Sequence, residues 1–218
     1  MSIQTIIFDM GNVLLEWNSD KILRSVESDA DRQEQLRQAI FDSGIWHAID
    51  AGQYTIEAAE QLACQQLEED YHAAVHQIMW HWYRYVDVFD DVQNLALPLV
   101  SAGYQLYILS NTSSLFYRLV EESFLPIVEY VSGVVLSYEE QQMKPESEIY
   151  QTLLERYQLC PEKCLFIDDI AENIATARSL GMQGCIAQDV TAIVTCLEEL
   201  IEAKKTKQER SEHSNGDN

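Results

Sequence analysis

Polar residues that can bind a cation or a phosphate group follow four hydrophobic segments of this chain. They comprise three carboxylates, a hydroxyl, an amide and an ammonium, on Asp9, Ser110, Asn111, Lys144, Asp168 and Asp169. Clustered carboxylates repel one another unless a cation neutralises them, and their hard oxygen atoms suit Mg²⁺. The ammonium, hydroxyl and amide groups suit the oxygens of a phosphate. The set therefore predicts phosphoryl transfer, in which a carboxylate attacks phosphorus and forms an aspartyl-phosphate.

The strands that precede these residues must bring them together. Short segments rich in Ile, Val, Leu, Phe or Tyr are predicted to form buried strands. They are Ile3–Phe8, Tyr104–Leu109, Tyr130–Leu136, Lys163–Ile167 and Gln183–Ala187. In an open parallel sheet, ligands bind beyond the carboxyl ends of the strands. The polar residues are therefore expected at one edge of the sheet.

Helical patterns lie between the strands. The predicted helices are Asp90–Ala102, Ser113–Phe124, Pro145–Tyr157, Ile170–Leu180 and Val190–Ala203. Gly103 and Gly181 suit the ends of two of them, because glycine is common just after a helix. Alternating strands and helices predict an α/β fold with a Rossmann-like parallel sheet at the centre of three layers.

One interval departs from this alternation. Between Leu15 and Val88 no segment has a strand pattern, and helices are predicted over Ser19–Ser28, Asp31–Phe41, Thr55–Leu67 and Asp70–Val86. We therefore expect a catalytic core of residues 1–15 and 89–202, with residues 16–88 inserted as a helical cap. The segment 203–218 lacks apolar periodicity and is expected to be disordered.

Each polar residue also has an ordinary structural interpretation. Asp9 can cap the turn after its strand, Ser110 can belong to a turn or a helix cap, and Lys144 can be exposed. Asp168 and Asp169 are harder to explain in this way, because two adjacent acids at the end of a buried strand are costly. The order and placement of all four motifs favour a shared site.

Taken together, the motifs resemble those of the haloacid dehalogenase superfamily, which consists mostly of phosphatases. The resemblance covers residues 3–200, and its motifs are Phe8–Val13, Leu109–Asn111, Lys144–Pro145, Ile167–Asp169 and the segment Ala177–Met182 that follows them. It implies a Mg²⁺-dependent phosphatase that acts on a small phosphorylated metabolite, such as a sugar phosphate. The motifs are specific for the superfamily and do not distinguish its substrates.

The resemblance also implies a set of metal ligands. Asp9 would be both the nucleophile and a ligand, and the backbone carbonyl of Gly11 would be a second ligand. Asp169, with Asp168 beside it, would complete the share of the coordination that the protein supplies.

Three residues are implied to handle the phosphate. Ser110 and the Asn111 amide would hold it, and Lys144 would neutralise Asp9 and the transferring group. The catalytic residues implied by the resemblance are thus Asp9, Lys144 and Ser110.

The chain departs from the family pattern at Gly11. Members usually have a second aspartate there, which protonates the leaving group and later activates water, a contribution of about 10²–10⁴-fold in rate. A subset with Asp-x-Gly-Asn, including bacterial sugar-1-phosphate phosphatases, resembles this chain. We hypothesise that Glu16 supplies the proton or a contact to water, the alternative being that Glu16 is a solvent-facing acid.

Other functions stay open at this point. A dehalogenase shares the aspartate nucleophile but not the metal, and Asp168 and Asp169 argue against it. A phosphomutase needs a strong acid–base group, which Gly11 does not provide. A binding or regulatory protein without turnover is favoured by Gly11 alone, since the other motif residues are present.

The charge of the chain excludes several partners. Its 14 basic and 36 acidic residues give a net charge of −22. Such a surface repels nucleic acid, and it offers no polybasic patch to an anionic membrane. No apolar run approaches the roughly 20 residues of a membrane span. Self-repulsion favours a monomer, although the oligomeric state cannot be read from the sequence.

Cysteines and histidines add little to the functional prediction. The five cysteines are scattered, and the first residues lack the features of a signal peptide, so a reduced cytoplasmic setting is expected. Cys160 and Cys164, like His72 and His76, are spaced to share a metal, but a core thiol and an ordinary helix face explain them better. Aromatic candidates for the substrate pocket are Trp46, Tyr54, Trp80 and Trp82.

Overall fold

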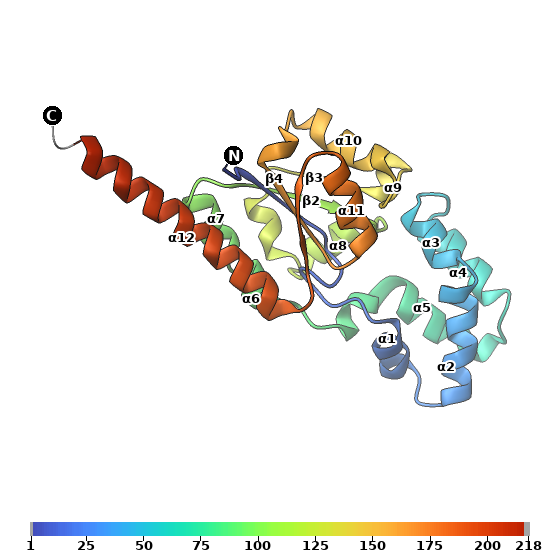
Figure 1. The fold of residues 1–218 in the computed structure, drawn as a ribbon. Coiled ribbons are helices and arrows are strands. Elements are labelled where there is room, and N and C mark those ends of the chain that lie inside the picture. Colours follow the sequence, from blue (N-terminus) through green and yellow to red (C-terminus); the bar gives the residue numbers. More distant parts are fainter. Residues whose placement is uncertain (1, 216–218) are drawn as a thin grey trace.

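The computed structural model describes residues 2–215, and its centre is a sheet of five parallel strands (Figure 1). The strand order is β3-β2-β1-β4-β5. The bounds are Thr5–Phe8 for β1, Gln105–Ser110 for β2, Gly133–Leu136 for β3, Cys164–Asp168 for β4 and Gln183–Ile186 for β5. The five predicted strands are confirmed. The third is shorter than expected because Pro126–Tyr130 forms a 3₁₀ turn, η4.

Alternating side chains of the strands pack against two helical layers. Ile7 packs with residues of α10 (Ser147–Arg156) and α11 (Ala171–Ser179) in one core cluster. Ile6 and Phe8 belong to a second, larger cluster on the opposite face. That face is covered by α7 (Ala96–Ser101), α8 (Leu115–Glu121) and α12 (Val190–Asn215). The predicted three-layer α/β class is therefore confirmed.

The helices of the core differ from the prediction in detail. The expected helix Asp90–Ala102 is divided into α6 (Asp90–Gln93) and α7. Pro98 explains the break, because a proline has no N–H to donate to the carbonyl four residues earlier. The short helix α9 (Ser137–Glu140) was not predicted.

Residues 16–88 form a helical insertion that lies to one side of the sheet (Figure 1). Its helices are α1 (Ser19–Val26), α2 (Ala30–Arg37), α3 (Ile45–Asp50), α4 (Ile56–Cys64) and α5 (His72–His81). Three of them, α1, α2 and α4, have an N-cap residue whose side chain accepts a backbone N–H of the first turn. These N-cap residues are Asn18, Asp29 and Thr55. The prediction missed α3, which has no such cap.

Two extended segments join the insertion to the core. Leu15 and Val88 form an isolated antiparallel bridge, and the Phe89 N–H donates to the Leu14 carbonyl at 3.0 Å. Glu16 and Asp87 continue the pairing, since the Glu16 N–H donates to the Asp87 carbonyl at 2.8 Å. The two connections therefore run side by side where the chain enters and leaves the insertion.

The expectation of a disordered segment 203–218 is wrong for residues 203–215, which extend α12 to Asn215. Glu, Lys, Gln and Ala favour a helix without an apolar stripe. Lys204 also ties the helix to the core, with Nζ 3.3 Å from the Gly103 carbonyl oxygen and 4.3 Å from the centre of the Tyr104 ring. Residues 216–218 lie outside the described residues. Within that described part, no helix combines the length and apolar character needed to cross a membrane.

Candidate active site

Asp9 is the first residue after β1, and the neighbouring strand holds it in place. Its N–H donates to the Ile167 carbonyl at 2.9 Å, which keeps it beside the end of β4. Its Oδ1 accepts the Met10 N–H at 2.7 Å, and the residue is only 7% exposed. Among the described residues no donor contacts Oδ2. One oxygen of this buried carboxylate is therefore free.

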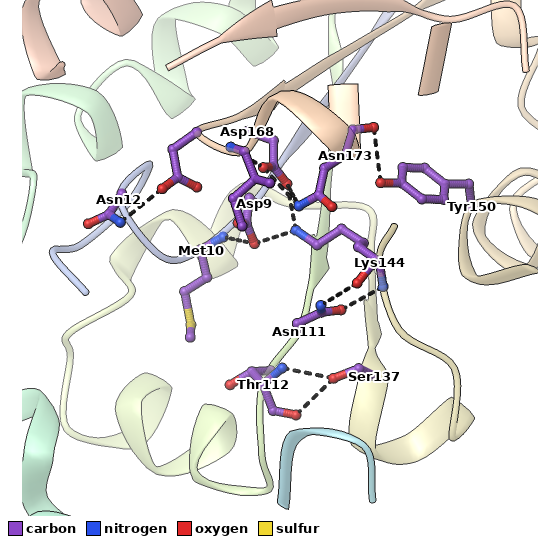
Figure 2. A network of polar contacts seen from close by, with 12 residues as sticks. Asp9, Met10, Asn12, Asn111, Thr112, Ser137, Lys144, Tyr150, Asp168 and Asn173 are labelled. Carbon is purple, nitrogen blue, oxygen red and sulfur yellow. Dashed lines mark hydrogen bonds and ion pairs between the residues drawn. The ribbon is translucent and has the colours of Figure 1, made fainter. Parts of the chain in front are cut away.

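Lys144 bridges two carboxylates at the carboxyl ends of the adjacent strands β1 and β4. Its Nζ lies 2.7 Å from Oδ1 of Asp9 and 2.7 Å from Oδ2 of Asp168 (Figure 2). The side chain is 1% exposed, which rules out an ordinary surface lysine. The Asn111 side chain holds the Lys144 backbone, donating to its carbonyl and accepting its N–H, both at 2.9 Å. The amide group of the Asn111 side chain is thus occupied in positioning Lys144.

Asp168 is completely buried and has donors on both oxygens. The Asn173 Nδ2 group lies 2.9 and 3.0 Å from its two oxygens, and the Ile170 N–H donates to Oδ1 at 2.8 Å. Lys144 donates to Oδ2. The Tyr150 hydroxyl donates to the Asn173 carbonyl at 3.1 Å and so supports this arrangement (Figure 2). A fully bonded carboxylate of this kind holds its neighbours in position.

Asp169 differs from Asp168 because it is half-buried and has fewer partners. Its Oδ2 accepts the Asn12 Nδ2 group at 2.9 Å, and no donor within residues 2–215 contacts Oδ1. Asn12 has a φ of 53°, a left-handed conformation that asparagine adopts more readily than most residues. Its Oδ1 accepts the Trp17 N–H at 2.9 Å. Asn12 therefore links the loop after β1 to Asp169 and to the start of the insertion.

The three carboxylates form one acidic group with the geometry of a candidate metal site. Ligand atoms of Asp9, Asp168 and Asp169 all lie within 4.8 Å of one another. Burial raises the pKa of Asp9 to about 7; the Lys144 ammonium opposes this shift and the Asp168 charge adds to it. Burial alone would lower the pKa of Lys144, but the two carboxylates outweigh it and raise that pKa. A cation would relieve the remaining repulsion among the acids.

Ser110 ends β2 beside this group and is 1% exposed. Its Oγ has no hydrogen-bond partner among the described residues. A buried hydroxyl without a partner costs about 1–3 kcal/mol, so such an atom is usually completed by a ligand or water. The next loop residues are better satisfied, since the Thr112 N–H donates to the Ser137 hydroxyl at 2.9 Å.

A cavity of about 430 Å³ lies between the carboxyl ends of the strands and the insertion. Its core wall includes Asp9, Asn111, Lys144 and Asp169. The residues of the insertion that line the cavity are called the insertion wall below, and they are Trp17, Ser19, Phe41, Trp46, His47, Asp50 and Trp82. Aromatic rings contact one another in this wall: the ring centres of Trp17 lie 4.8 Å from Trp46 and 4.9 Å from Trp82.

The aromatic candidates named from the sequence are divided by the structure. Trp46 and Trp82 line the cavity. Trp80 instead donates to the Glu60 carboxylate at 2.8 Å, and Tyr54 is 45% exposed. Neither of these two is among the residues that line the cavity.

Glu16 lies at the junction with the insertion and does not line the cavity. Its carboxylate accepts hydrogen bonds from Lys21 at 2.6 Å, from Asn18 at 3.1 Å and from the Asp87 N–H at 3.3 Å. Burial raises the pKa of Glu16, but these hydrogen bonds outweigh it and the pKa lies below its ordinary value. A carboxyl with a lowered pKa, held in this way, is poorly suited to donate a proton at neutral pH.

The paired histidines and cysteines have separate partners. His76 Nδ1 contacts the Glu60 carboxylate at 2.8 Å, whereas His72 Nε2 contacts the Cys64 carbonyl at 3.2 Å. Cys164 is buried and its thiol donates to the Cys160 carbonyl at 3.2 Å, while Cys160 is exposed. These contacts agree with the ordinary interpretations of both pairs.

Sequence reasoning missed residues that position or face the site. Asn12 bonds to Asp169 and Asn173 bonds to Asp168. Asp50 lies on the unpredicted helix α3. A weak signal existed for Asn173, which lies five residues after Asp168 on the next helix. The sequence offered no comparable signal for Asp50, because α3 is short and uncapped.

A parallel sheet with clustered carboxylates at the carboxyl ends of its central strands defines an α/β protein with a candidate active site at the switch point of the sheet. The chain matches the haloacid dehalogenase-like hydrolase family over residues 3–181, and it belongs to that family.

Named relatives span nearly the same length. A D-ribitol-5-phosphate phosphatase of Bacteroides thetaiotaomicron is 25% identical over 195 residues, which are 83% of this chain and 90% of the relative. A sesquiterpene phosphatase of Aspergillus oryzae is 24% identical over 204 residues, 88% of this chain and 92% of the relative.

A solved structure has the same fold. It is a haloacid dehalogenase family enzyme of Bacteroides thetaiotaomicron in complex with magnesium and inorganic phosphate. The match has a TM-score of 0.69 and 22% identity, and it covers 85% of this chain and 94% of that one. At this identity the likeness establishes the fold.

Proposed function

We propose that this protein is a Mg²⁺-dependent phosphatase that hydrolyses a small phosphorylated metabolite through an aspartyl-phosphate on Asp9. The observation that carries the proposal is the buried Asp9 carboxylate, bonded to Lys144 and grouped with two further acids. Two relatives of nearly the same length are named as phosphatases, and the solved structure binds magnesium and phosphate. A sugar or polyol phosphate is the favoured substrate.

The donor set fits Mg²⁺, because its groups are oxygens within 4.8 Å of one another. Oδ2 of Asp9 and Oδ1 of Asp169 have no donor in the described chain, and Gly11 lies beside them on the cavity. We assign these two carboxylates and the Gly11 carbonyl as ligands. Asp168 is assigned to positioning, since its oxygens are already bonded. A bound Mg²⁺ would neutralise phosphate charge and the repulsion among the acids.

The phosphate would be held by groups that still have unused donors. Ser110 offers a buried hydroxyl without a partner. Lys144 has three N–H groups and two carboxylate contacts, so one N–H is left for a phosphate oxygen. The Asn111 side chain is occupied by the Lys144 backbone, and we assign the phosphate contact to its main-chain N–H. These donors would face the charge that develops during transfer.

Oδ1 of Asp9 is the oxygen best prepared to attack phosphorus. The Met10 N–H and Lys144 fix its direction, and the ammonium lowers the repulsion between the carboxylate and the phosphoryl oxygens. Attack forms the bond from Asp9 to phosphorus and breaks the bond from phosphorus to the leaving oxygen, which takes up a proton. Water then attacks the same phosphorus, releasing inorganic phosphate and restoring Asp9.

The helical insertion is proposed to be a cap over this site, formed by residues 16–88 between two core segments, 1–15 and 89–202. It supplies the wall opposite Asp9, and the cavity volume of about 430 Å³ suits a metabolite and is too small for a folded phosphoprotein. Closure would keep bulk water from the phosphoenzyme until the leaving group departs.

A second candidate function is favoured by Gly11 alone. The usual aspartate is absent at this position, which favours a protein that kept the fold and binds its ligand without catalysing turnover. A dehalogenase gains no support from the site, because a second and third acid beside the nucleophile have little use without a cation.

A substrate panel tests the proposal. Phosphorylated sugars, ribitol 5-phosphate and p-nitrophenyl phosphate are assayed with Mg²⁺ and with EDTA, together with 2-chloropropionate for dehalogenation. The expected result is phosphate release that depends on Mg²⁺ and is abolished in Asp9→Asn. The control Asp42→Asn alters an exposed acid of the insertion and should leave phosphate release unchanged. Binding without turnover would favour the second candidate, and chloride release in EDTA would indicate a dehalogenase.

A further inference from the structure

The proposed reaction lacks an acid–base group in the core wall of the cavity. Gly11 has no side chain, and a Cβ built there would lie 3.4 Å from the Cβ of Trp17. Glu16 is bonded to Lys21 outside the cavity. The remaining acids of the core wall are Asp9 and Asp169, which are already assigned to attack and to the metal. The carboxyl and imidazole groups of the cavity lining that have no assigned role therefore belong to the insertion wall.

Helix α3 brings three polar or aromatic side chains to that wall. Trp46, His47 and Asp50 line the cavity, and Asp50 lies one helical turn after the adjacent pair Trp46 and His47. Asp50 is the only carboxylic acid that the described insertion contributes to the lining. It therefore faces the same enclosed space as Asp9 from the opposite side.

The core holds the backbone of Asp50 in this place. The Ser137 hydroxyl donates to the Asp50 carbonyl at 2.5 Å and accepts the Thr112 N–H at 2.9 Å. Thr112 lies on the loop after β2 that also carries Ser110. Two hydrogen bonds thus connect Asp50 to the loop proposed to hold phosphate.

A close contact at Gly52 fixes the same turn. Gly52 has a φ of +70°, and a Cβ built there would lie 2.3 Å from the Tyr138 carbonyl oxygen. Only a residue without a side chain allows the turn to approach α9 so closely. The end of α3 is therefore seated directly on the core.

The surroundings of the Asp50 carboxyl keep it partly protonated. Burial raises its pKa to about 7, and a hydrogen bond from Trp46 opposes this shift. A general acid works best when its pKa lies near the operating pH. Four other ionisable residues line the same cavity: His47, Asp9, Lys144 and Asp169. Two elements that pack against α3 also carry ionisable residues, which are the exposed Asp42 on the π-helix η1 (Gln38–Asp42) and Tyr138, Glu139 and Glu140 on α9.

We infer that Asp50 is the acid–base catalyst of the proposed phosphatase, replacing the aspartate that is absent at Gly11. As the bond between phosphorus and the leaving oxygen breaks, the Asp50 carboxyl donates its proton to that oxygen. In the second step the Asp50 carboxylate takes a proton from the water that attacks the phosphoryl group on Asp9. The proton gained in the second step restores the acid for the next substrate. This inference rests on the proposed function.

Leaving-group dependence separates an acid catalyst from a structural residue. The ratio kcat/KM reports the steps through departure of the leaving group, and a good leaving group needs no proton. The probes are p-nitrophenyl phosphate, phenyl phosphate and ribitol 5-phosphate, given in order from the best leaving group to the poorest. Asp50→Asn keeps the backbone contact with Ser137, and thermal unfolding checks that it folds.

The expected result is a loss of kcat/KM in Asp50→Asn that grows from the best leaving group to the poorest. Asp50→Asn lowers kcat/KM about 10²-fold or more for ribitol 5-phosphate and by less than about threefold for p-nitrophenyl phosphate. The control Asp42→Asn, on the exposed part of the insertion, leaves kcat/KM unchanged for both substrates. The basic limb of the pH profile with phenyl phosphate disappears in Asp50→Asn.

Other outcomes overturn the inference. An equal loss on all probes would make Asp50 structural, and no loss would remove it from the reaction. The selective loss appearing in His47→Gln instead would assign the proton transfer to His47. A wild-type chain with no activity that depends on Asp9 would refute the proposed function itself, which separates the two failures.

Discussion

The two walls of the cavity are built in different ways. In the core wall, Lys144 contacts two carboxylates at 2.7 Å, and behind it the buried Asp168 has donors on both oxygens. In the insertion wall, the contacts are mainly between aromatic rings, with Trp17 at the centre. Paired charges at the ends of strands hold atoms at fixed positions, whereas ring packing tolerates different shapes. The core wall therefore suits a constant reaction, and the aromatic rings of the insertion wall suit a variable substrate.

The largest effect is expected when the nucleophile is removed from the core wall. Asp9→Asn should lower kcat/KM for p-nitrophenyl phosphate by at least about 10³-fold, because the amide cannot form the phosphoenzyme. Steady-state kinetics measures the loss, and circular dichroism checks the fold. Residual activity within about tenfold of wild type would contradict the assignment of Asp9.

Removing the Lys144 ammonium from the core wall should lower stability in addition to impairing the reaction. Lys144→Met leaves Asp9 and Asp168 buried without their partner, and a loss of about 3–5 kcal/mol in the free energy of unfolding is expected. Urea unfolding at neutral pH measures it. The matched control is Lys21→Met, whose pairs with Glu16 and Asp87 are partly exposed and worth at most about 1 kcal/mol. Equal losses of unfolding free energy in the two variants would contradict the expectation that the buried lysine contributes more than the exposed one.

The acidic group should respond to Mg²⁺ before any substrate is present. A cation that binds only the folded state stabilises it by about 2.7 kcal/mol at 100 times its Kd, so Tm should rise with Mg²⁺. Asp169→Asn should abolish the rise because it removes an assigned ligand, whereas Asp42→Asn should retain it. Thermal unfolding with and without EDTA provides the measurement. A rise that persists in Asp169→Asn would place the cation elsewhere.

The aromatic rings of the insertion wall should affect substrate binding more than chemistry. Phe41→Ala opens space beside Trp46, whose ring centre lies 5.2 Å away. For a substrate that contacts this wall, KM should rise about tenfold, equivalent to about 1.4 kcal/mol, with kcat changed less than about threefold. A loss confined to kcat would instead connect this wall to the reacting atoms.

The smallest effect is expected at the junction of core and insertion. Glu16→Gln should cost at most about 1 kcal/mol and leave the pH–rate profile unchanged, since Glu16 does not line the cavity. Its folded pKa is lowered, so its contribution is present above the unfolded value of about 4.3 and disappears as pH falls through the folded value. Wild type should therefore lose its advantage in urea unfolding below about pH 4. A changed pH–rate profile would restore Glu16 as a candidate acid.

Local patterns in the sequence were sufficient for the framework of the core. The five hydrophobic segments identified the strands, and the strand ends placed Asp9, Ser110 and Asp168 at one edge. This works because parallel strands buried on both faces are recognisable from composition, and their carboxyl ends must meet. Errors came where local preference was ambiguous, as at Pro98 and in the continuation of α12.

Only the tertiary structure decided how the site is completed. It gave Asp168 a full set of donors, left an oxygen of Asp169 free, and turned the Asn111 side chain toward the Lys144 backbone. It also seated α3 on Ser137 and so brought Asp50 into the cavity. The contacts of Asn111, Asp50 and Asp169 join residues that are 33, 87 and 157 positions apart in the chain. The sequence determined which strand ends carry chemistry, because that depends on neighbouring residues, whereas the partner of each group depends on long-range packing that no local pattern records.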